Sequence, residues 1–225
     1  RQETHVWSYP DYVALRDAGI GADLLGWASA PAEVALDPSL GGTREAGAMF
    51  ASANYLDVLG ERLAQGSGFF QTADPLAIVS HAFWQHRLAA APNVVGMVIP
   101  INDVPHTIVG VTREGFHGHL GFQNVEVWLP LERHPSVLAD TTIRFDRARE
   151  WVRVHGRLQP TVTVEQASAA VAALTAQLAK EHAATNDQKA GVVQAYHPLG
   201  VLDGVNLPIV LTIVQALAAL PLLVV

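Results

Sequence analysis

Residues 151–181, WVRVHGRLQPTVTVEQASAAVAALTAQLAKE, carry the clearest secondary-structure pattern in the chain. The first eight residues alternate apolar and polar side chains, which is typical of a strand with one buried face. Thr163 and Gln166 then have the spacing of a capping box, which marks the start of a helix. Apolar side chains follow at helical spacings of three and four: Val164, Ala167, Val171, Leu174 and Leu178. The sequence therefore predicts a strand and then an amphipathic helix to about residue 184.

Two further segments extend this strand and helix into a sheet covered by helices. Residues 192–197 predict a closing strand, and residues 44–60 predict a strand at 44–51 followed by a short helix. Ser52 or Asn54 is expected to cap that helix, and Gly60 to end it in a left-handed conformation. Together, residues 44–60 and 151–197 predict an α+β fold with a layer of helix on a sheet.

The segment between them, about residues 75–130, is expected to form an inserted lobe. Ser80 is placed to cap a helix, and Asn102-Asp103 to form a hairpin turn, because Asn and Asp tolerate positive φ. The lobe is predicted to contain strands at 76–80, 94–101, 104–111 and 125–129 and a helix at 81–91. A short helix is also expected after Pro10, near the beginning of the chain.

The C-terminal end is apolar on all sides. Residues 204–225 contain no charged side chain, and the run LPIVLTIVQALAALPLLVV from Leu207 is interrupted only by Thr212 and Gln215. As a helix it would reach about 28 Å, close to the ~30 Å hydrocarbon core of a bilayer. Residues 206–225 are therefore predicted to begin a transmembrane helix; a buried helix of a soluble domain is the alternative. The side chains expected in the membrane are Leu207, Ile209, Leu211, Ile213, Leu217, Leu220, Leu222 and Val225.

Composition narrows the class of protein. The chain has 225 residues, of which 50% are hydrophobic and 16% charged, and its formal net charge is −7. An acidic balance argues against a nucleic-acid partner, which requires a basic surface. The absence of cysteine excludes disulfides, Cys-ligated zinc, iron–sulfur clusters and thiol nucleophiles. The chain begins at Arg1 without a signal peptide, and we expect it to be a piece of a longer polypeptide.

No catalytic constellation emerges from the residues. Neither a nucleophile elbow nor a phosphate-binding P-loop occurs in the sequence. His81 and His86 are five residues apart on one expected helix, which points them in different directions. His117 and His119, with His106, remain an alternative metal site. We therefore predict no catalytic residue, no bound cofactor and no metal.

One basic cluster stands out: Arg144, Arg147, Arg149, Arg153 and Arg157. Acidic residues at positions 140, 146 and 150 dilute it. The cluster is interpreted either as a solvated face or as a contact for an anionic partner or lipid headgroup.

Several short motifs follow one another along the chain: SYPDY at 8–12, SANYLDVLG at 52–60, VSHAFWQHRL at 79–88, IVGV at 108–111, VWLPL at 127–131 and GRLQP at 156–160. This ordered series resembles the extracytoplasmic core domain of MacB-like ABC transporter permeases. The similarity is closest to the large duplicated permeases common in acidobacteria. Ser67 stands where the family pattern has arginine, which leaves the geometry of that loop open.

The resemblance implies a two-lobed periplasmic domain in residues 1–205, with a porter-like α/β lobe and an inserted mixed α/β lobe. Residues 206–225 would then begin the next transmembrane helix. Such permeases lie in the bacterial inner membrane with this domain facing the periplasm. They are FtsX-like membrane proteins that work with a cytoplasmic ABC ATPase subunit and a second permease protomer or half. ATP hydrolysis is coupled to periplasmic movement for export or mechanotransmission, and no cofactor is implied.

Two other functions stay open from the sequence alone. One is a soluble α+β hydrolase that uses the region of His117 and His119, with the C-terminal segment as a buried helix. The other is a membrane-tethered domain that binds a ligand or acts as a sensor without any transporter.

Overall fold

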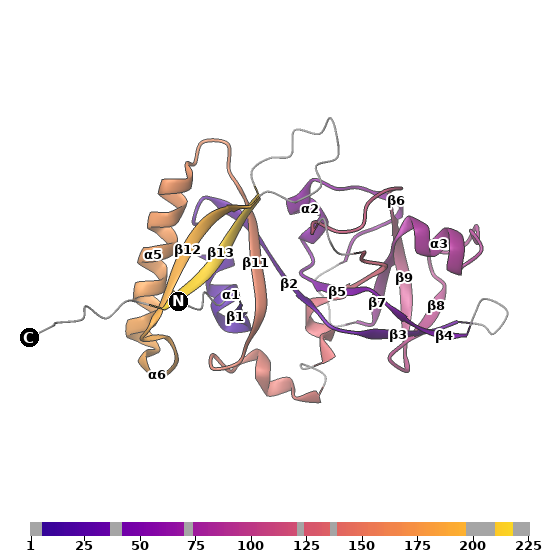
Figure 1. Ribbon diagram of the computed structural model, residues 1–225, viewed down its shortest axis with the longest axis horizontal. Coiled ribbons are helices and arrows are strands. Elements are labelled where there is room, and N and C mark those ends of the chain that lie inside the picture. The colour runs from indigo at the N-terminus through magenta and orange to yellow at the C-terminus, as the bar shows by residue number, and fades with distance from the viewer. Residues whose placement is uncertain are drawn as a thin grey trace, which may run out of the picture. The chain divides into compact units, whose positions relative to one another are not determined.

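The structure is a computed structural model that describes residues 6–36, 42–69, 74–120, 124–135, 139–196 and 210–217. Its chain divides into two compact units (Figure 1). Unit 1 combines the described residues up to Leu24 with those from Thr142 onward, and unit 2 is formed by Leu25–Thr141. Unit 2 is thus inserted into unit 1, as expected for a two-lobed domain. The insertion is wider than the predicted 75–130, so residues 44–60 belong to it rather than to the layer that contains residues 151–197.

Unit 1 is a small sheet with one long helix. Strands β12, β13 and β11 are adjacent and antiparallel, and β1 pairs with β11 in the register Ser8↔Glu150. The first residues of β2 continue the order beside β11. The elements are β1 (Trp7–Ser8), α1 (Tyr9–Asp17), the start of β2 (Ala22–Ser29), β11 (Glu150–Leu158), α5 (Val164–Glu181), α6 (Ala183–Asn186), β12 (Lys189–Tyr196) and β13 (Val210–Leu217).

The predicted strand and capped helix of this unit are confirmed. The Thr163 side chain accepts a hydrogen bond from the Gln166 backbone N–H at 3.2 Å, and the Gln166 side chain accepts one from the Thr163 N–H at 2.9 Å. Each bond satisfies a donor that the first turn of a helix leaves unpaired. Ala167, Val171 and Leu178 are buried along α5, as their spacing predicts.

The helix α5 packs very closely on β12 at Gly191. A Cβ atom at this position would lie 2.3 Å from Val171 Cγ1 and 3.0 Å from Thr175 Cγ2. The backbone N–H of Gly191 donates a hydrogen bond to the Thr175 hydroxyl at 3.2 Å. Glycine is therefore the residue that lets helix and strand approach to this distance.

Residues Val210–Leu217 were predicted to belong to a transmembrane helix, but in the structure they form strand β13. Every residue of β13 is opposite a residue of β12, and residues 210–213 also pair with β11. These two neighbours supply backbone partners on both sides, and the β-branched residues at 210 and 212–214 favour a strand. The remaining predicted positions, 206–209 and 218–225, lie outside the described residues.

Unit 2 is built on a mixed sheet in the order β2-β5-β10-β7-β9-β8-β3-β4, with β6 paired to β9. Short helices accompany it. Its elements are the rest of β2, β3 (Ala32–Ala35), β4 (Thr43–Ala46), β5 (Ala48–Ala51), α2 (Tyr55–Leu59), β6 (Leu63–Gly66), β7 (Leu76–Val79), α3 (His81–Arg87), β8 (Val98–Ile101), β9 (Val104–Thr112), β10 (Val127–Pro130) and η2 (Leu131–Arg133). Another 3₁₀ helix, η3 (Thr141–Arg144), spans the point where the chain returns to unit 1.

The single strand predicted at 44–51 is divided in the structure at Gly47. The run expected at 44–51 is divided at Gly47 into β4 and β5, which lie far apart in the strand order. The carbonyl of Gly47 accepts hydrogen bonds from the N–H groups of Glu126 and Val127 at 2.8 and 3.1 Å. Because β4 and β5 are joined by one residue, the sheet of unit 2 must curve back on itself.

Several local predictions in unit 2 are confirmed. Ser80 caps α3 through a 3.0 Å hydrogen bond from the Phe83 N–H, and Gly60 ends α2 with φ of 71°. Asn102 and Asp103 form the turn between β8 and β9 with φ of 49° and 61°. The predicted ends of the elements are less accurate. Helix α3 ends at Arg87, not at the predicted residue 91, and strand β8 begins at Val98, not at the predicted residue 94.

Replacing Gly191 with alanine should destabilise unit 1. The added methyl group overpacks the contact with Val171, and we expect a loss of about 1–3 kcal/mol in the free energy of unfolding. Urea unfolding monitored by circular dichroism measures this loss. Gly68→Ala is the matched control, because a Cβ there meets nothing within 4 Å. Equal stability of the two variants would contradict the close packing of α5 on β12.

Candidate functional site

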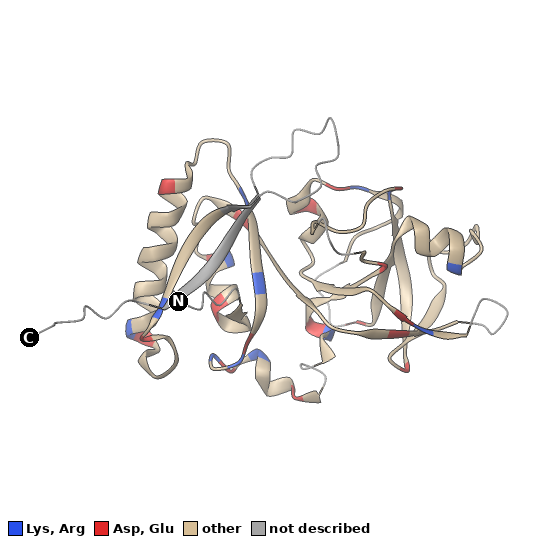
Figure 2. Cartoon of the chain, in the orientation of Figure 1, with Lys and Arg blue, Asp and Glu red and all other residues tan. Residues whose placement is uncertain are grey.

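The most strongly buried charge in unit 1 is the carboxylate of Asp11, in the first turn of α1. Its side chain is 0% exposed. Asp11 Oδ1 accepts hydrogen bonds from Arg147 and from Asn186 Nδ2, the latter at 2.9 Å. Oδ2 accepts one from the Ser8 hydroxyl at 2.7 Å. Both oxygens are therefore occupied by side chains from three separate segments, and basic and acidic residues lie together where α1 meets the start of β11 (Figure 2).

Lys189, the first residue of β12, completes this cluster. Its ammonium lies 3.6 Å from Asp11 Oδ2 and 2.7 Å from Glu150 Oε1, and it donates to the Arg147 carbonyl at 3.2 Å. The two carboxylates and two cations balance, so the cluster carries no net charge. We call these residues, with Ser8 and Asn186, the Asp11 cluster.

The Asp11 cluster is suited to holding the chain together rather than to chemistry. A general base needs a carboxylate oxygen that can reach a substrate proton, and a metal needs oxygens that are not already paired with cations. Asp11 offers neither. The sequence pointed to Arg147 but not to its partner, because nothing local distinguishes a buried aspartate in the first turn of a helix from an exposed one.

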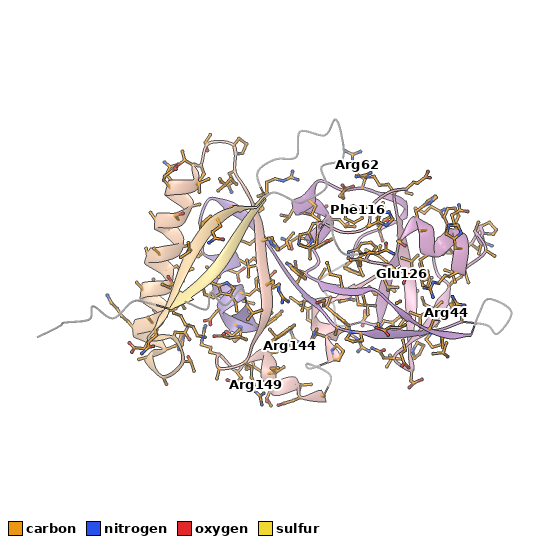
Figure 3. The ribbon with its side chains drawn as sticks, viewed as in Figure 1. Arg44, Arg62, Phe116, Glu126, Arg144 and Arg149 are labelled. Atoms are coloured by element: carbon orange, nitrogen blue, oxygen red, sulfur yellow. The ribbon has the colours of Figure 1, made fainter. Side chains whose placement is uncertain are left out.

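The five arginines of the predicted basic cluster do not act as one face. Arg147 is bound to Asp11, whereas the Arg144 guanidinium lies 5.4 Å from the centroid of the Tyr9 ring. Arg149 is exposed over 68% of its side chain and lies 3.9 Å from Asp146. Arg153 and Arg157 are on β11. Figure 3 shows Arg144 and Arg149 on the segment that leads into β11.

An open pocket of about 310 Å³ lies in unit 2, beside the junction of β4 and β5. Its lining is mostly small and apolar, with one hydroxyl, one carboxylate and one amide: Ser29, Ala30, Pro31, Glu45, Ala46, Gly47, Ala48, Asn124 and Val125. The neighbouring Glu126 is already engaged, by Arg87 at 2.9 Å and by the Gly47 N–H at 3.3 Å. The hydroxyl, carboxylate and amide of the lining can hold a small polar group.

The candidate metal ligands are used in separate contacts. His119 is buried, its Nδ1 is 2.8 Å from the Tyr55 hydroxyl, and its ring packs edge-on against Trp27. The Nδ1 of His106 is 2.8 Å from the Val104 carbonyl, while His117 is exposed. Across the part of the chain that the structure describes, no group of three or more His, Asp and Glu side chains could hold a metal ion.

Burial disfavours the charged form of two histidines in unit 2. Burial lowers the pKa of His134, opposed by a hydrogen bond with the Ser29 backbone, and its ring packs edge-on against Phe50. Burial also lowers the pKa of His106, with the nearby Arg133 charge acting in the same direction. Neither residue was singled out for this by the sequence, because the cause is burial in the folded unit.

The predicted membrane residues are placed only in part. Leu211, Ile213 and Leu217 lie in β13, and the other five lie outside the described residues. Within the ranges that the structure describes, no helix combines the length and the apolar character needed to cross a bilayer.

Comparison with known families identifies the domain. Residues 6–174 match the model of the MacB-like periplasmic core domain. This match covers well over half of the 225 residues, so the chain belongs to that family, a family of ABC transporter permease domains. No curated protein sequence matches the chain.

Solved structures agree on the fold. The periplasmic region of MacB from Actinobacillus actinomycetemcomitans is similar with a TM-score of 0.59 and 16% identity, covering 83% of this chain and 78% of that one. The extracellular domain of YknZ, a noncanonic ABC-type transporter from Gram-positive bacteria, is similar with a TM-score of 0.57 and 12% identity, covering 80% of this chain and 86% of that one. At these identities the likeness establishes the α+β fold alone.

Asp11→Asn should destabilise unit 1 strongly. The change removes the negative charge that Arg147 and Lys189 share, and breaking a buried ion pair in this way costs about 3–5 kcal/mol. Urea unfolding of the 225-residue chain measures the loss. Asp17→Asn on the same helix is the matched control, because its pair with Arg16 is exposed and contributes less than about 1 kcal/mol. Similar losses for both variants would show that Asp11 is not the central contact.

The buried histidines predict a loss of stability in acid. Their folded pKa values lie below the ordinary value of 6.5, so the unfolded chain takes up protons first as the pH falls. The free energy of unfolding should be at its full value above pH 6.5 and decline below it. Urea unfolding between pH 5 and 8 tests this, and His106→Gln and His134→Gln should each reduce the slope. The exposed His117→Gln is the control, and an unchanged slope in all three variants would contradict the assignment.

Proposed function

We propose that this chain is the extracytoplasmic domain of a permease subunit that couples ATP hydrolysis by a separate cytoplasmic ATPase to movement outside the membrane. The observation that carries the proposal is the family match over residues 6–174, which spans both units. The movement would serve export or mechanotransmission. A second permease protomer or half is the proposed partner within the membrane.

The arrangement of unit 1 supports this role. The register Ser8↔Glu150 places the beginning of the described chain at the start of β11. The register Lys189↔Leu217 places the end of β13 at Lys189, whose ammonium bonds Glu150 at 2.7 Å. Residue 6 and Leu217 therefore lie at one end of unit 1. A domain held at both chain ends on one side can be moved as a body by the segments attached there.

The Asp11 cluster would give unit 1 the stiffness that such movement requires. It ties α1 to the loop before β11 and to the start of β12. Force applied at either chain end then acts on the whole unit. Within the described residues, the chain would carry this force into unit 2 at Leu24–Leu25 and at Thr141–Thr142.

We place the domain on the periplasmic side of the bacterial inner membrane, anchored by the uncharged C-terminal segment. Because residues 210–217 form a strand, a membrane helix in this segment would be limited to residues after Leu217. Leu220, Leu222 and Val225 are the proposed bilayer contacts within the chain. For the alternative hydrolase, the two histidines differ in surroundings: His117 is exposed, whereas His119 is buried against Tyr55 and Trp27.

Nucleotide-dependent movement between the units tests the proposal. These 225 residues contain no cysteine, so an introduced pair is the only labelled pair within them. In the permease that carries this domain, reconstituted with its ATPase, labels at Val98→Cys in unit 2 and Phe145→Cys in unit 1 report the distance between units. We expect the distance distribution from double electron–electron resonance to change between the nucleotide-free and the vanadate-trapped ATP state.

A pair within unit 1, Phe145→Cys with Val192→Cys, is the matched control and should stay unchanged. All three sites have exposed side chains, so the labels replace little packing. Identical distributions for the Val98–Phe145 pair in both nucleotide states would count against coupling. A change in the control pair would show deformation of unit 1 instead of movement between units.

A further inference from the structure

Phe145 is the most exposed large hydrophobic residue in the described part of the chain. It is 82% exposed, compared with 57% for Val98, 43% for Val95 and 39% for Val192. It lies in the turn between η3 and β11, with Arg144 before it and Arg149 four residues later. A single exposed apolar side chain is common on protein surfaces, so the meaning of this one depends on the charges and chain segments next to it.

The turn is held in place from both sides. Before Phe145, the Arg144 guanidinium lies over the Tyr9 ring, which stacks on Trp151 with centroids 5.9 Å apart and planes at 9°. After it, Arg147 is bound to the buried Asp11. The Phe145 N–H itself donates to the Thr142 carbonyl at 2.8 Å. The exposure of Phe145 is thus imposed by contacts on either side of it.

The position of the turn points to what covers it. The turn leads directly into Glu150, which pairs with Ser8 across the sheet and bonds Lys189 opposite Leu217. Phe145 therefore belongs to the end of unit 1 at which the described chain begins and at which β13 ends. The sequence continues from Leu217 with eight uncharged residues, AALPLLVV.

We propose that residues 142–149, here called the Phe145 loop, seat on the headgroup layer of a phospholipid bilayer. Phe145 inserts its ring at the boundary with the acyl chains, where aromatic side chains are favoured. Arg149, whose side chain is 68% exposed, binds lipid phosphate, for which a guanidinium offers paired donors. The inference rests on the proposed function, because it takes the chain ends of unit 1 to face the membrane.

The charges around the loop suit an anionic surface. Arg144 and Arg149 stand against Asp146, whose carboxylate is 3.9 Å from Arg149, and Arg147 is neutralised by Asp11. Residues 142–149 thus keep one positive charge in excess, while the exposed Asp140 lies two residues before the loop and the whole chain has a net charge of −7. Binding is expected to weaken as salt screens this surplus.

An environment-sensitive label on the 225-residue chain tests the proposal. Phe145→Cys carrying a nitrobenzoxadiazole fluorophore is mixed with vesicles of phosphatidylcholine and phosphatidylglycerol in a ratio of 7 to 3. We expect the emission to shift to the blue and to rise about twofold or more as the label enters the headgroup layer. Vesicles of phosphatidylcholine alone should produce a smaller change, because the phosphatidylglycerol charge attracts the arginine.

Replacing Arg149 distinguishes specific binding of the Phe145 loop to lipid from random collision of the chain with vesicles. Arg149→Gln in the labelled chain should weaken the partition into anionic vesicles by about fivefold, the effect of one basic charge near such a surface. Arg44→Gln in unit 2 is the matched control, since Arg44 is also exposed (Figure 3), and it should leave the partition unchanged. Equal weakening by both would show a general effect of charge and overturn the role of Arg149.

Two further label sites distinguish this inference from the proposed function. A label at Val98→Cys should not respond to vesicles, and an equal response there would mean non-specific adsorption and overturn the proposal. A label at Ala219→Cys reports entry of the C-terminal segment. A response at 219 without one at 145 would overturn the Phe145 loop while leaving the permease domain intact. No response at either site would overturn the Phe145 loop, whereas the nucleotide-dependent distance between the units tests the proposed function separately. If the label at position 145 responds to added unlabelled chain in the absence of lipid, the Phe145 loop binds a second copy of the chain, and the proposal is overturned.

Discussion

The carboxylate of Asp11 is the contact on which unit 1 depends. It joins Arg147 and Asn186, which are 136 and 175 residues away in the sequence, to the first turn of α1. Unit 2 is inserted between these partners, so the early part of unit 1 must find the late part after more than a hundred intervening residues. A buried carboxylate without its cations is strongly unfavourable, so arrangements in which Arg147 and Lys189 do not reach Asp11 are destabilised.

This constraint also organises the end of unit 1 where the chain enters and leaves. Glu150 and Lys189 extend the Asp11 cluster to the start of β11 and β12, and the Phe145 loop is fixed by Arg147 on one side and Tyr9 on the other. The same residues therefore stiffen unit 1 and fix the Phe145 loop at its surface. Stiffness is what a domain needs to transmit movement, and a fixed surface loop is what it needs to rest on a bilayer.

Local signals in the sequence predicted local structure well. The capping box at Thr163, the cap at Ser80 and the turn at Asn102 depend on hydrogen bonds and φ angles within a few residues, so the pattern contains the whole cause. The ordered series of short motifs also predicted the family, which the match over residues 6–174 confirms. The local pattern at residues 44–60 did not indicate which unit they join, because a short strand and helix look alike in either sheet.

The sequence by itself determined the α+β class, the two-lobed plan and most helix starts, because periodicity and capping act over short distances. Only the tertiary structure decided that residues 210–217 pair as β13, since an uncharged run becomes a strand when β11 and β12 offer it backbone partners on both sides. It also decided that Asp11 is buried and that Phe145 is not. Burial is a property of the chain segments that surround a residue, and those segments lie far away in the sequence.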